Sequence, residues 1–190
     1  VENYRRSGVT DAMRIPKDGF YAHQVMWNGW VDTERYQTFI VGHWNYEPGT
    51  KKTVYVVSNG EEVELLLNGK RLGKGRRDYN FLFSFDNVKF EAGVLEAISY
   101  DAKGEEVSRD IMKTAGEPAQ LRLTTIENPD GFKADGADMA LLQFEVVDKD
   151  GRRCPLDNRE VKFTVKGEGE WRGGIAQGPD NYILIKTLPV

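Results

Sequence analysis

Two Asn-Gly dipeptides, Asn59-Gly60 and Asn68-Gly69, divide residues 54–73 into short apolar runs. An Asn-Gly pair readily places both residues at positive φ, which the type I′ turn of a β-hairpin requires. Between the two turns, apolar residues occupy alternate positions, as in a strand with one face more deeply buried than the other. These positions are Val63, Leu65 and Leu67. The stretch is therefore predicted to form a β-meander, whose apolar face needs a second layer, as in a β-sandwich.

Apolar and β-branched segments outside this meander predict the strands that complete the sandwich. They are residues 38–44, 81–88, 93–100 and 105–112. With the meander they give about seven strands, close to the strand density of an immunoglobulin-like domain. Gly116-Glu117-Pro118 then interrupts the pattern, because proline cannot donate to a strand ladder and biases its predecessor to extended geometry. Residues 34–115 are therefore predicted to form one β-sandwich domain, followed by a short linker.

A second β unit is predicted over residues 116–190. Its expected strands are residues 119–126, 139–148, 160–166 and 182–187, and a glycine-rich loop separates the last two. These strands are fewer than the about seven that an immunoglobulin-like sandwich needs. We therefore expect the second sandwich to be incomplete, with an open sheet edge through which the chain can form a homo-oligomer.

Residues 1–33 have a different pattern. Pro16 suits the first position of a helix, and apolar residues follow it at helical spacing as far as about Trp30. We expect Trp27 and Trp30, which share one helix face, to be core residues, and His23 to be partly buried on the helix surface. Because the rest of the chain is predicted as strand, the apolar side of this helix must pack on a sandwich or on protein outside the chain.

The composition and charge of the chain limit the classes of function that it can have. A net charge of −4 leaves no basic surface for nucleic acid, so we expect no nucleic-acid binding. The lone Cys154 can form neither an internal disulfide nor a thiolate metal site. The sequence has no apolar run long enough to span a membrane, and its first residues lack the apolar region of a signal peptide. We therefore expect the chain as given neither to cross a membrane nor to carry its own export signal.

Asp148, Asp150 and Gly151 resemble the start of a calcium-binding loop. The bidentate acid that closes such a loop is lacking, and an Asp-x-Asp-Gly hairpin turn accounts for the same residues. The turn is the favoured interpretation. We expect no metal ion and no cofactor.

Three motifs extend across the first two regions: D-x-x-R-x-P-K from Asp11 to Lys17, G-H-W-N at 42–45, and S-N-x-x-x-V-E-L-x-L-N-G-K at 58–70. Together they resemble the part of family 2 glycoside hydrolases, notably bacterial β-galactosidase-like enzymes, where the catalytic barrel ends and the C-terminal sandwiches begin. The first motif resembles the segment that leads into the last helix of the (β/α)₈ barrel, and the other two resemble the following sandwich. Residues after Pro118 resemble a further immunoglobulin-like domain.

The resemblance implies a mainly β chain, with two immunoglobulin-like β-sandwiches in tandem preceded by one helix left over from the barrel. It also implies that the parent is a retaining β-galactosidase with two catalytic glutamates about 5 Å apart on barrel strands. Those strands would precede Val1, so we assign no catalytic residue here and expect the chain alone to be inactive. Its expected partner is the rest of the parent chain, whose barrel and cleft the sandwiches would support. The family further implies a periplasmic or secreted parent.

Five residues are candidates for contact with substrate or with a neighbouring domain. They are Tyr4, Arg5, His43, Trp44 and Trp171. The resemblance places Tyr4 and Arg5 in the loop after the eighth barrel strand, at the catalytic face. For His43 we favour a structural hydrogen bond, and for Trp44 packing at the junction of barrel and sandwich. Trp171 lies in a glycine-rich loop, where it either contacts a ligand or anchors the loop on its own sandwich.

These aromatic residues leave a second function open. Aromatic faces stack on the apolar side of pyranose rings, so the chain could be an independent carbohydrate-binding module. Titration of the chain with galactosides and oligosaccharides distinguishes the two hypotheses. An adhesion-type immunoglobulin-like protein is disfavoured, because such arrays do not need the predicted helix.

Overall fold

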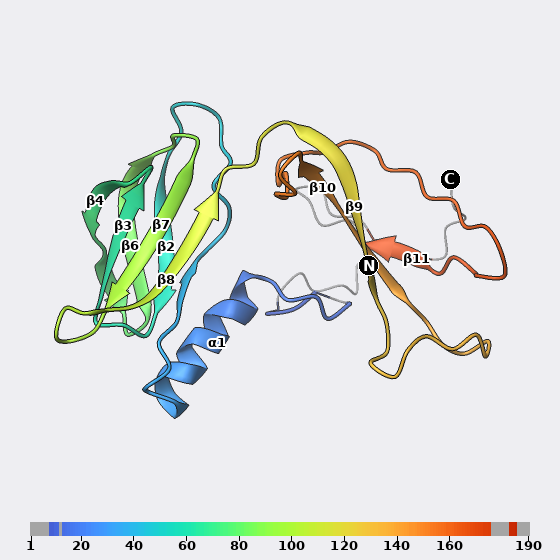
Figure 1. The fold of residues 1–190 in the computed structure, drawn as a ribbon, viewed down its shortest axis with the longest axis horizontal. Helices are drawn as coiled ribbons and strands as arrows, with labels where there is room; N and C mark the ends of the chain where they lie inside the picture. Colours follow the sequence, from blue (N-terminus) through green and yellow to red (C-terminus); the bar gives the residue numbers. More distant parts are fainter. Residues whose placement is uncertain (1–7, 12, 176–182, 186–190) are drawn as a thin grey trace, which may run out of the picture. The chain divides into compact units, whose positions relative to one another are not determined.

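The computed structural model describes residues 8–11, 13–175 and 183–185. The chain divides into two compact units, residues 1–114 and residues 115–190, which are described separately below. The described part contains one helix and otherwise antiparallel strands (Figure 1), so the chain is mainly β, as predicted. The boundary between the units falls between Thr114 and Ala115, and β9 (Pro118–Ile126) begins at Pro118.

Unit 1 is a β-sandwich with one helix at its N-terminal end. One four-stranded sheet has the order β1-β2-β6-β5 and the other the order β4-β3-β7-β8. The elements are α1 (Asp18–Val31), β1 (Thr38–Ile40), β2 (Lys51–Ser58), β3 (Glu62–Leu67), β4 (Lys70–Lys74), β5 (Arg76–Tyr79), β6 (Leu82–Lys89), β7 (Val94–Tyr100) and β8 (Glu106–Lys113). The predicted second layer over the apolar face of β3 is therefore present.

The core of unit 1 lies between these two sheets. Val63, Leu65 and Leu67 of β3 are all buried, which confirms the predicted alternation. Phe83 and Phe85 of β6 face them from the other sheet as members of the same buried cluster. Each fully buried side chain of this size contributes roughly 1.5–3 kcal/mol of hydrophobic stabilisation.

The predicted meander is correct at one Asn-Gly turn and wrong at the other. Asn68 and Gly69 have φ of 52° and 78°, and they join β3 to β4 in a hairpin. Asn59-Gly60, in contrast, carries the chain from β2 in one sheet to β3 in the other, without positive φ. The Asn59 side chain is used elsewhere: Oδ1 accepts the Gln37 amide at 2.7 Å and Nδ2 donates to the Arg35 carbonyl at 2.9 Å.

Helix α1 begins at Asp18, two residues later than predicted, and Lys17 occupies the N-cap position. Pro16 instead lies in an isolated β-bridge with Thr10. The predicted burial of the two helix tryptophans is wrong for the described residues, because Trp27 and Trp30 each remain 64% exposed. The helix turns Val25 inward, and Gly29 allows a close approach, since a Cβ there would lie 2.5 Å from Phe81.

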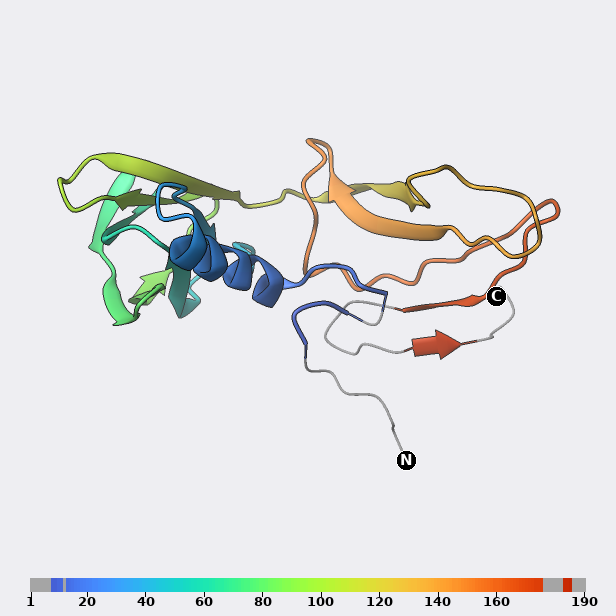
Figure 2. The same ribbon diagram turned by 90° about the horizontal axis from the view of Figure 1, so that it is seen from below.

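Unit 2 consists of shorter sheets. β9 (Pro118–Ile126) pairs with β10 (Leu141–Asp148), and β11 (Gly173–Ile175) pairs with β12 (Ile183–Ile185). The predicted strand at 160–166 is wrong, because this segment forms no ladder with the described strands, and β11 lies inside the predicted glycine-rich loop. Figure 2 shows the irregular chain after β10 running along one side of the β9–β10 sheet. Among described residues, β9 has a partner strand on one edge and none on the other.

Candidate functional site

Trp44 lies in the core of unit 1. Its side chain is 2% exposed, and its indole N–H donates to the Glu91 carbonyl at 3.0 Å. Tyr46 and Phe90 pack edge-on against the ring, with centroid distances of 5.9 and 5.4 Å. Because the surrounding protein covers the indole, Trp44 has the environment of a sandwich core residue and offers no open ring face to a ligand.

His43 lies half-buried beside this core. Its ring stacks on Tyr46 at 4.5 Å, and the Asn45 amide donates to Nδ1 at 3.2 Å. An Nδ1 that accepts a hydrogen bond leaves the proton of the neutral ring on Nε2. The predicted structural hydrogen bond of His43 is therefore present, and a contact with substrate stays a prediction.

Trp171 is half-buried within unit 2. It stacks on Phe163 with a centroid distance of 5.4 Å, and Phe163 in turn packs edge-on against Phe144 of β10 at 4.7 Å. These contacts place the loop on its own unit, which was the structural alternative for Trp171. The aromatic row was not evident from the sequence, because Phe163 was assigned to a strand. Tyr4 and Arg5 lie outside the described residues.

The helix surface carries the remaining candidates of the sequence. His23, expected to be partly buried, is exposed, and its Nδ1 lies 2.6 Å from the Gly19 carbonyl one turn earlier. The exposed fractions of Trp27, Trp30 and Val31 lie between 64% and 66%. Large apolar side chains are costly to leave in water, so a contiguous exposed group of them marks an interaction surface.

One arginine of unit 1 brings two carboxylates together. Arg76 Nε lies 2.7 Å from Asp78, and its Nη1 lies 2.6 Å from Asp86. Hydrogen bonds from Arg76 hold the pKa of both carboxyl groups below the usual value, and Thr53 adds to the effect at Asp86. The general acid of a retaining glycosidase needs the opposite shift, a raised pKa. This pair therefore ties β5 to β6 and is unsuited to acid catalysis.

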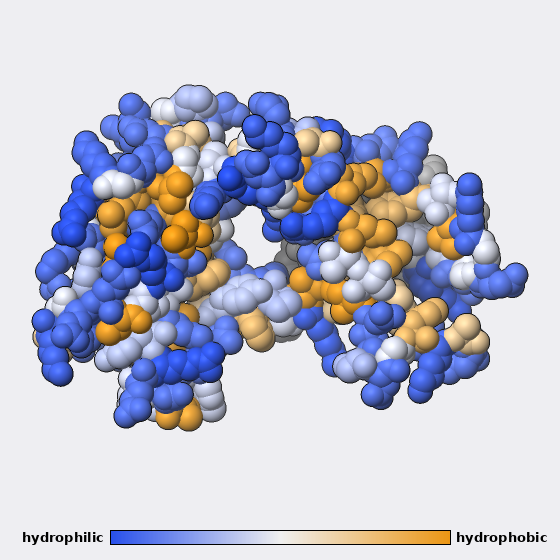
Figure 3. Space-filling view, viewed as in Figure 1, coloured by the Kyte–Doolittle hydropathy of each residue, from blue (hydrophilic) through white to orange (hydrophobic). Residues whose placement is uncertain are grey.

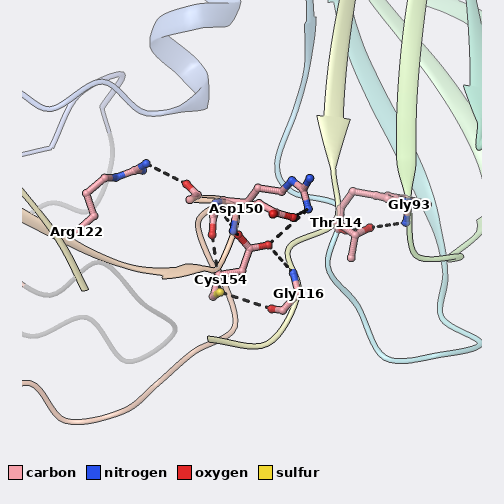
Figure 4. Close-up of polar contacts among 10 residues, drawn as sticks. Gly93, Thr114, Gly116, Arg122, Asp150 and Cys154 are labelled. Atoms are coloured by element: carbon pink, nitrogen blue, oxygen red, sulfur yellow. Dashed lines mark hydrogen bonds and ion pairs between the residues drawn. The ribbon is translucent and has the colours of Figure 1, made fainter. Parts of the chain in front are cut away.

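Asp148 closes the turn after β10 and is the most completely buried carboxylate among the described residues of unit 2. Oδ1 accepts the amides of Asp150 and Arg152 at 2.9 and 2.8 Å, and Oδ2 accepts the Gly116 amide at 2.8 Å (Figure 4). The Gly116 hydrogen bond holds the pKa of Asp148 below its usual value; the other two amides and the Arg152 charge act in the same direction, and burial opposes them.

The turn interpretation of this acidic sequence is confirmed. The Gly151 amide donates to the Asp148 carbonyl at 3.0 Å, with a Gly151 φ of 77°. The bond from Gly116 was not evident from the sequence, because it joins residues far apart in the chain. The described residues contain no group of three or more His, Cys, Asp or Glu side chains that could hold a metal ion.

Two surface grooves of unit 1 were also not evident from the sequence. The smaller, of about 240 Å³, is lined by groups that include Tyr21, Gln24, Tyr36, Gln37, Phe39 and Arg109. The larger, of about 530 Å³, has buried apolar side chains at its base and lysines at its rim. Among them are Leu67, Phe85, Val88, Lys70 and Lys89.

Within the described residues, no helix combines the length and apolar character needed to cross a membrane.

Apolar side chains also reach the surface of unit 2. Figure 3 shows orange residues gathered over the β9–β10 sheet. Leu121, Leu123 and Ile126 of β9 are 55%, 61% and 43% exposed.

Two family models match the chain. Residues 49–108 match "Domain of unknown function (DUF4982)", and residues 122–183 match "Glycoside hydrolase family 2 C-terminal domain 5". The first match lies within the sandwich of unit 1 and the second within unit 2.

Two curated relatives are similar over most of the chain. A β-glucuronidase of Formosa agariphila is 46% identical over 182 residues, which is 95% of this chain and 18% of the relative. A β-galactosidase of Bacteroides ovatus, BoGH2A, is 36% identical over 165 residues, which is 85% of this chain and 18% of the relative. The chain thus spans less than a fifth of the length of these relatives.

Two solved structures are similar to the chain in fold. A β-glucuronidase from glycoside hydrolase family 2 superposes with a TM-score of 0.83 at 46% identity, over 94% of this chain and 18% of that protein. A β-glycosidase from Bacteroides vulgatus superposes with a TM-score of 0.70 at 26% identity, over 94% of this chain and 22% of that protein.

Proposed function

We propose that this chain, which belongs to the C-terminal region of glycoside hydrolase family 2, is a non-catalytic part of a glycosidase and supports its catalytic barrel. In this proposal the sandwiches brace the barrel and help to shape its cleft, while the catalytic glutamates lie elsewhere in the parent chain. The match to less than a fifth of each relative supports the proposal, because most of a family 2 enzyme then lies outside the chain.

The observation that carries the proposal is the exposed aromatic face of α1. The helix rests on the sandwich through Val25 and Gly29, while Trp27 and Trp30 are each 64% exposed. Fully burying one such side chain stabilises a protein by roughly 1.5–3 kcal/mol. A docking surface for the rest of the parent chain accounts for this exposure, in agreement with the resemblance of this segment to the last barrel helix.

The test compares Trp27→Ser with Tyr79→Ser, because Tyr79 is another exposed aromatic residue, 75% exposed at the end of β5. In the full-length parent, we expect Trp27→Ser to lower the free energy of unfolding by about 2 kcal/mol, and Tyr79→Ser to have little effect. In the 190-residue chain alone, both variants should match the unaltered chain. Equal and small effects of the two variants in the parent would contradict the proposal.

The parent activity is a separate part of the proposal. The resemblance in the sequence favoured a β-galactosidase, whereas the two relatives above are named β-glucuronidase and β-galactosidase. We therefore propose that the parent is a retaining β-glycosidase that acts on β-glucuronides or on β-galactosides. The full-length parent should hydrolyse a chromogenic β-glucuronide or β-galactoside, and the chain alone should hydrolyse neither. Turnover by the purified chain, abolished by substitution of one of its carboxylates, would contradict this assignment.

An independent carbohydrate-binding module is the second candidate. The groove of about 240 Å³ favours it, because the groove combines the rings of Tyr21, Tyr36 and Phe39 with amide side chains, as sugar sites do. Titration of the chain with galactosides, glucuronides and oligosaccharides tests this function. Millimolar or tighter binding that is lost in Trp171→Ala or Tyr36→Ala would support it, and no binding would leave the supporting role.

We also propose a periplasmic or secreted location for the parent, from the family resemblance alone. Fractionation of cells that express the full-length gene tests it.

We also propose that the chain forms a homo-oligomer through β9, which has a free edge among the described strands. The exposed leucines of β9 provide the proposed contact. Sedimentation of the chain should then show a dimer that Leu123→Lys dissociates.

A further inference from the structure

The smaller groove of unit 1, of about 240 Å³, lies where α1, β8 and the segment that leads into β1 meet. Aromatic rings line it. Tyr21 of α1 packs on Phe39 of β1 with a centroid distance of 5.2 Å and an angle of 30° between the rings, and Tyr36 adds a third ring. Tyr21 remains 41% exposed, so part of its ring is open to solvent. The groove thus offers ring surface of the kind that packs on the apolar side of a sugar.

Neutral polar side chains lie beside these rings. Gln37 is held in place, because its Oε1 accepts a hydrogen bond from Asn28 Nδ2 at 2.7 Å. Gln24 of α1 and the Tyr36 hydroxyl also line the groove, and neither side chain forms a hydrogen bond with another described residue. Amide and hydroxyl groups both donate and accept hydrogen bonds. They therefore match the hydroxyl groups of a sugar, which do the same.

The charge at one end of the groove disfavours an anion. Of the described residues that line the groove, Arg109 of β8 alone carries a charge. Its guanidinium donates to Glu106 from Nε at 2.9 Å and from Nη2 at 2.8 Å, and to Glu96 from Nη1. Two carboxylates thus surround one guanidinium and leave an excess of negative charge there. A ligand carboxylate would be repelled by this excess.

The volume of the groove limits the size of its ligand. About 240 Å³ lies below the roughly 300–1,000 Å³ of sites for drug-sized ligands, so the groove suits one sugar ring rather than several. We infer that it binds a single neutral hexopyranose and discriminates against the corresponding uronic acid. The inference rests on the proposed carbohydrate-binding function and adds the class of sugar, an uncharged one, whichever β-glycoside the parent hydrolyses.

The test is an NMR titration of the 190-residue chain with two matched pairs of methyl glycosides. The pairs are methyl β-galactoside with methyl β-galacturonide, and methyl β-glucoside with methyl β-glucuronide, and the members of each pair differ only at C6. At least one neutral sugar should bind with millimolar or tighter affinity, and its uronide about tenfold more weakly. A uronide that binds as tightly as its neutral partner would overturn the inference and leave the carbohydrate-binding function intact. No binding of any of these sugars would overturn both.

Gln24→Ala tests whether the groove is the binding site. Gln24 is exposed on α1, where alanine is a favourable helix residue, so the variant should keep the fold. Loss of the amide should weaken binding of the neutral sugar several-fold. Gln120→Ala, at an exposed position of β9 in unit 2, is the matched control and should bind as the unaltered chain does. Unchanged affinity in Gln24→Ala would overturn the assignment of the sugar to this groove.

A double variant, Glu96→Gln with Glu106→Gln, tests the role of charge. It removes both negative charges beside Arg109 and should bind the uronide about tenfold more tightly than the unaltered chain does. The control, Glu62→Gln with Glu91→Gln, makes the same change in net charge at positions that do not line this groove.

No gain in uronide affinity in the first double variant, or equal gains in both, would overturn the inference. The comparison within each sugar pair uses the unaltered chain, so the inference can still be overturned if a variant fails to fold.

Discussion

At the scale of single residues, Gly60 shows how close packing can limit which residue a position accepts. Its φ is not positive, so its backbone conformation is open to other residues. A Cβ at this position, however, would lie 2.9 Å from the Ser99 Cβ and 3.0 Å from the Tyr100 carbonyl oxygen. Gly60→Ala should therefore destabilise unit 1 by about 1–3 kcal/mol, as overpacking does.

Gly19→Ala is the matched control for Gly60, because its new Cβ would meet Val9 at 3.5 Å, an ordinary contact. Gly19 lies in α1, where alanine is favoured over glycine by up to about 1 kcal/mol. Urea denaturation of both variants should give changes of opposite sign. If Gly60→Ala were neutral, the close approach of this connection to β7 would not be as described.

Asp148 provides a prediction about pH. Its pKa is lowered in the folded chain, first by the Gly116 hydrogen bond, so the unfolded chain takes up its proton at higher pH than the folded chain. The resulting stabilisation is present above the ordinary carboxyl value of 3.8 and is lost as pH falls below it toward the folded pKa. Denaturation of unit 2 between pH 6 and about pH 2 should show this loss.

Asp148→Asn should remove this part of the pH dependence, since the amide does not titrate. Asp150→Asn retains Asp148 and should therefore keep this part of the pH dependence. A pH profile of Asp148→Asn that falls as steeply as that of the unaltered chain would show that other carboxylates cause the acid sensitivity.

At the scale of elements, the β3–β4 hairpin depends on Asn68 in two ways. Asn68 has φ of 52°, and its side chain accepts the Val94 amide at 2.8 Å and donates to the Ala92 carbonyl at 3.1 Å. Asn68→Gly keeps the backbone conformation and should cost about 1–3 kcal/mol for two lost hydrogen bonds. Asn68→Ala should cost roughly 1 kcal/mol more, because alanine resists positive φ.

Thermal and urea denaturation of the two Asn68 variants provide the comparison. Lys103→Ala, in the exposed turn between β7 and β8, is the control and should change stability by less than about 0.5 kcal/mol. Equal losses in Asn68→Gly and Asn68→Ala would mean that the positive φ contributes nothing.

The same dipeptide had two outcomes, which marks the limit of local sequence reasoning. Asn68-Gly69 forms the predicted turn because its hydrogen bonds lie within its own sheet. Asn59-Gly60 was expected to do the same, but Asn59 bonds to the backbone of residues 35 and 37, in the segment before β1. Dipeptide preference predicts which conformations are open to a turn, whereas contacts distant in sequence select one of them.

Apolar periodicity predicted the buried strands of unit 1 well, because alternation reports directly which side chains face the core. It missed β5, whose sequence Arg76-Arg77-Asp78-Tyr79 lacks that alternation and lies at a sheet edge, held by ion pairs. It also predicted that Trp27 and Trp30 are buried. Periodicity identifies an apolar helix face but not the protein that covers it.

At the scale of the whole chain, the Gly116–Asp148 bond and the two grooves could not be predicted, because each depends on how distant segments pack. The family resemblance, in contrast, gave information on distant parts of the chain. It explained an isolated helix before a sandwich, which periodicity alone could not, and the matches to family 2 proteins agree with it.

The two units differ in how much apolar surface they bury, so we expect them to unfold separately. Unit 1 has a continuous buried cluster between its sheets, whereas the buried apolar residues in the described part of unit 2 are Ala115 and Val147. Since burial of apolar surface is the main stabilising contribution, unit 2 should unfold at lower urea concentration. With fluorotryptophan labels, the Trp171 resonance should report that transition and Trp44 the later one. Coincident transitions would contradict this expectation, because they would mean that the two units unfold as one cooperative structure.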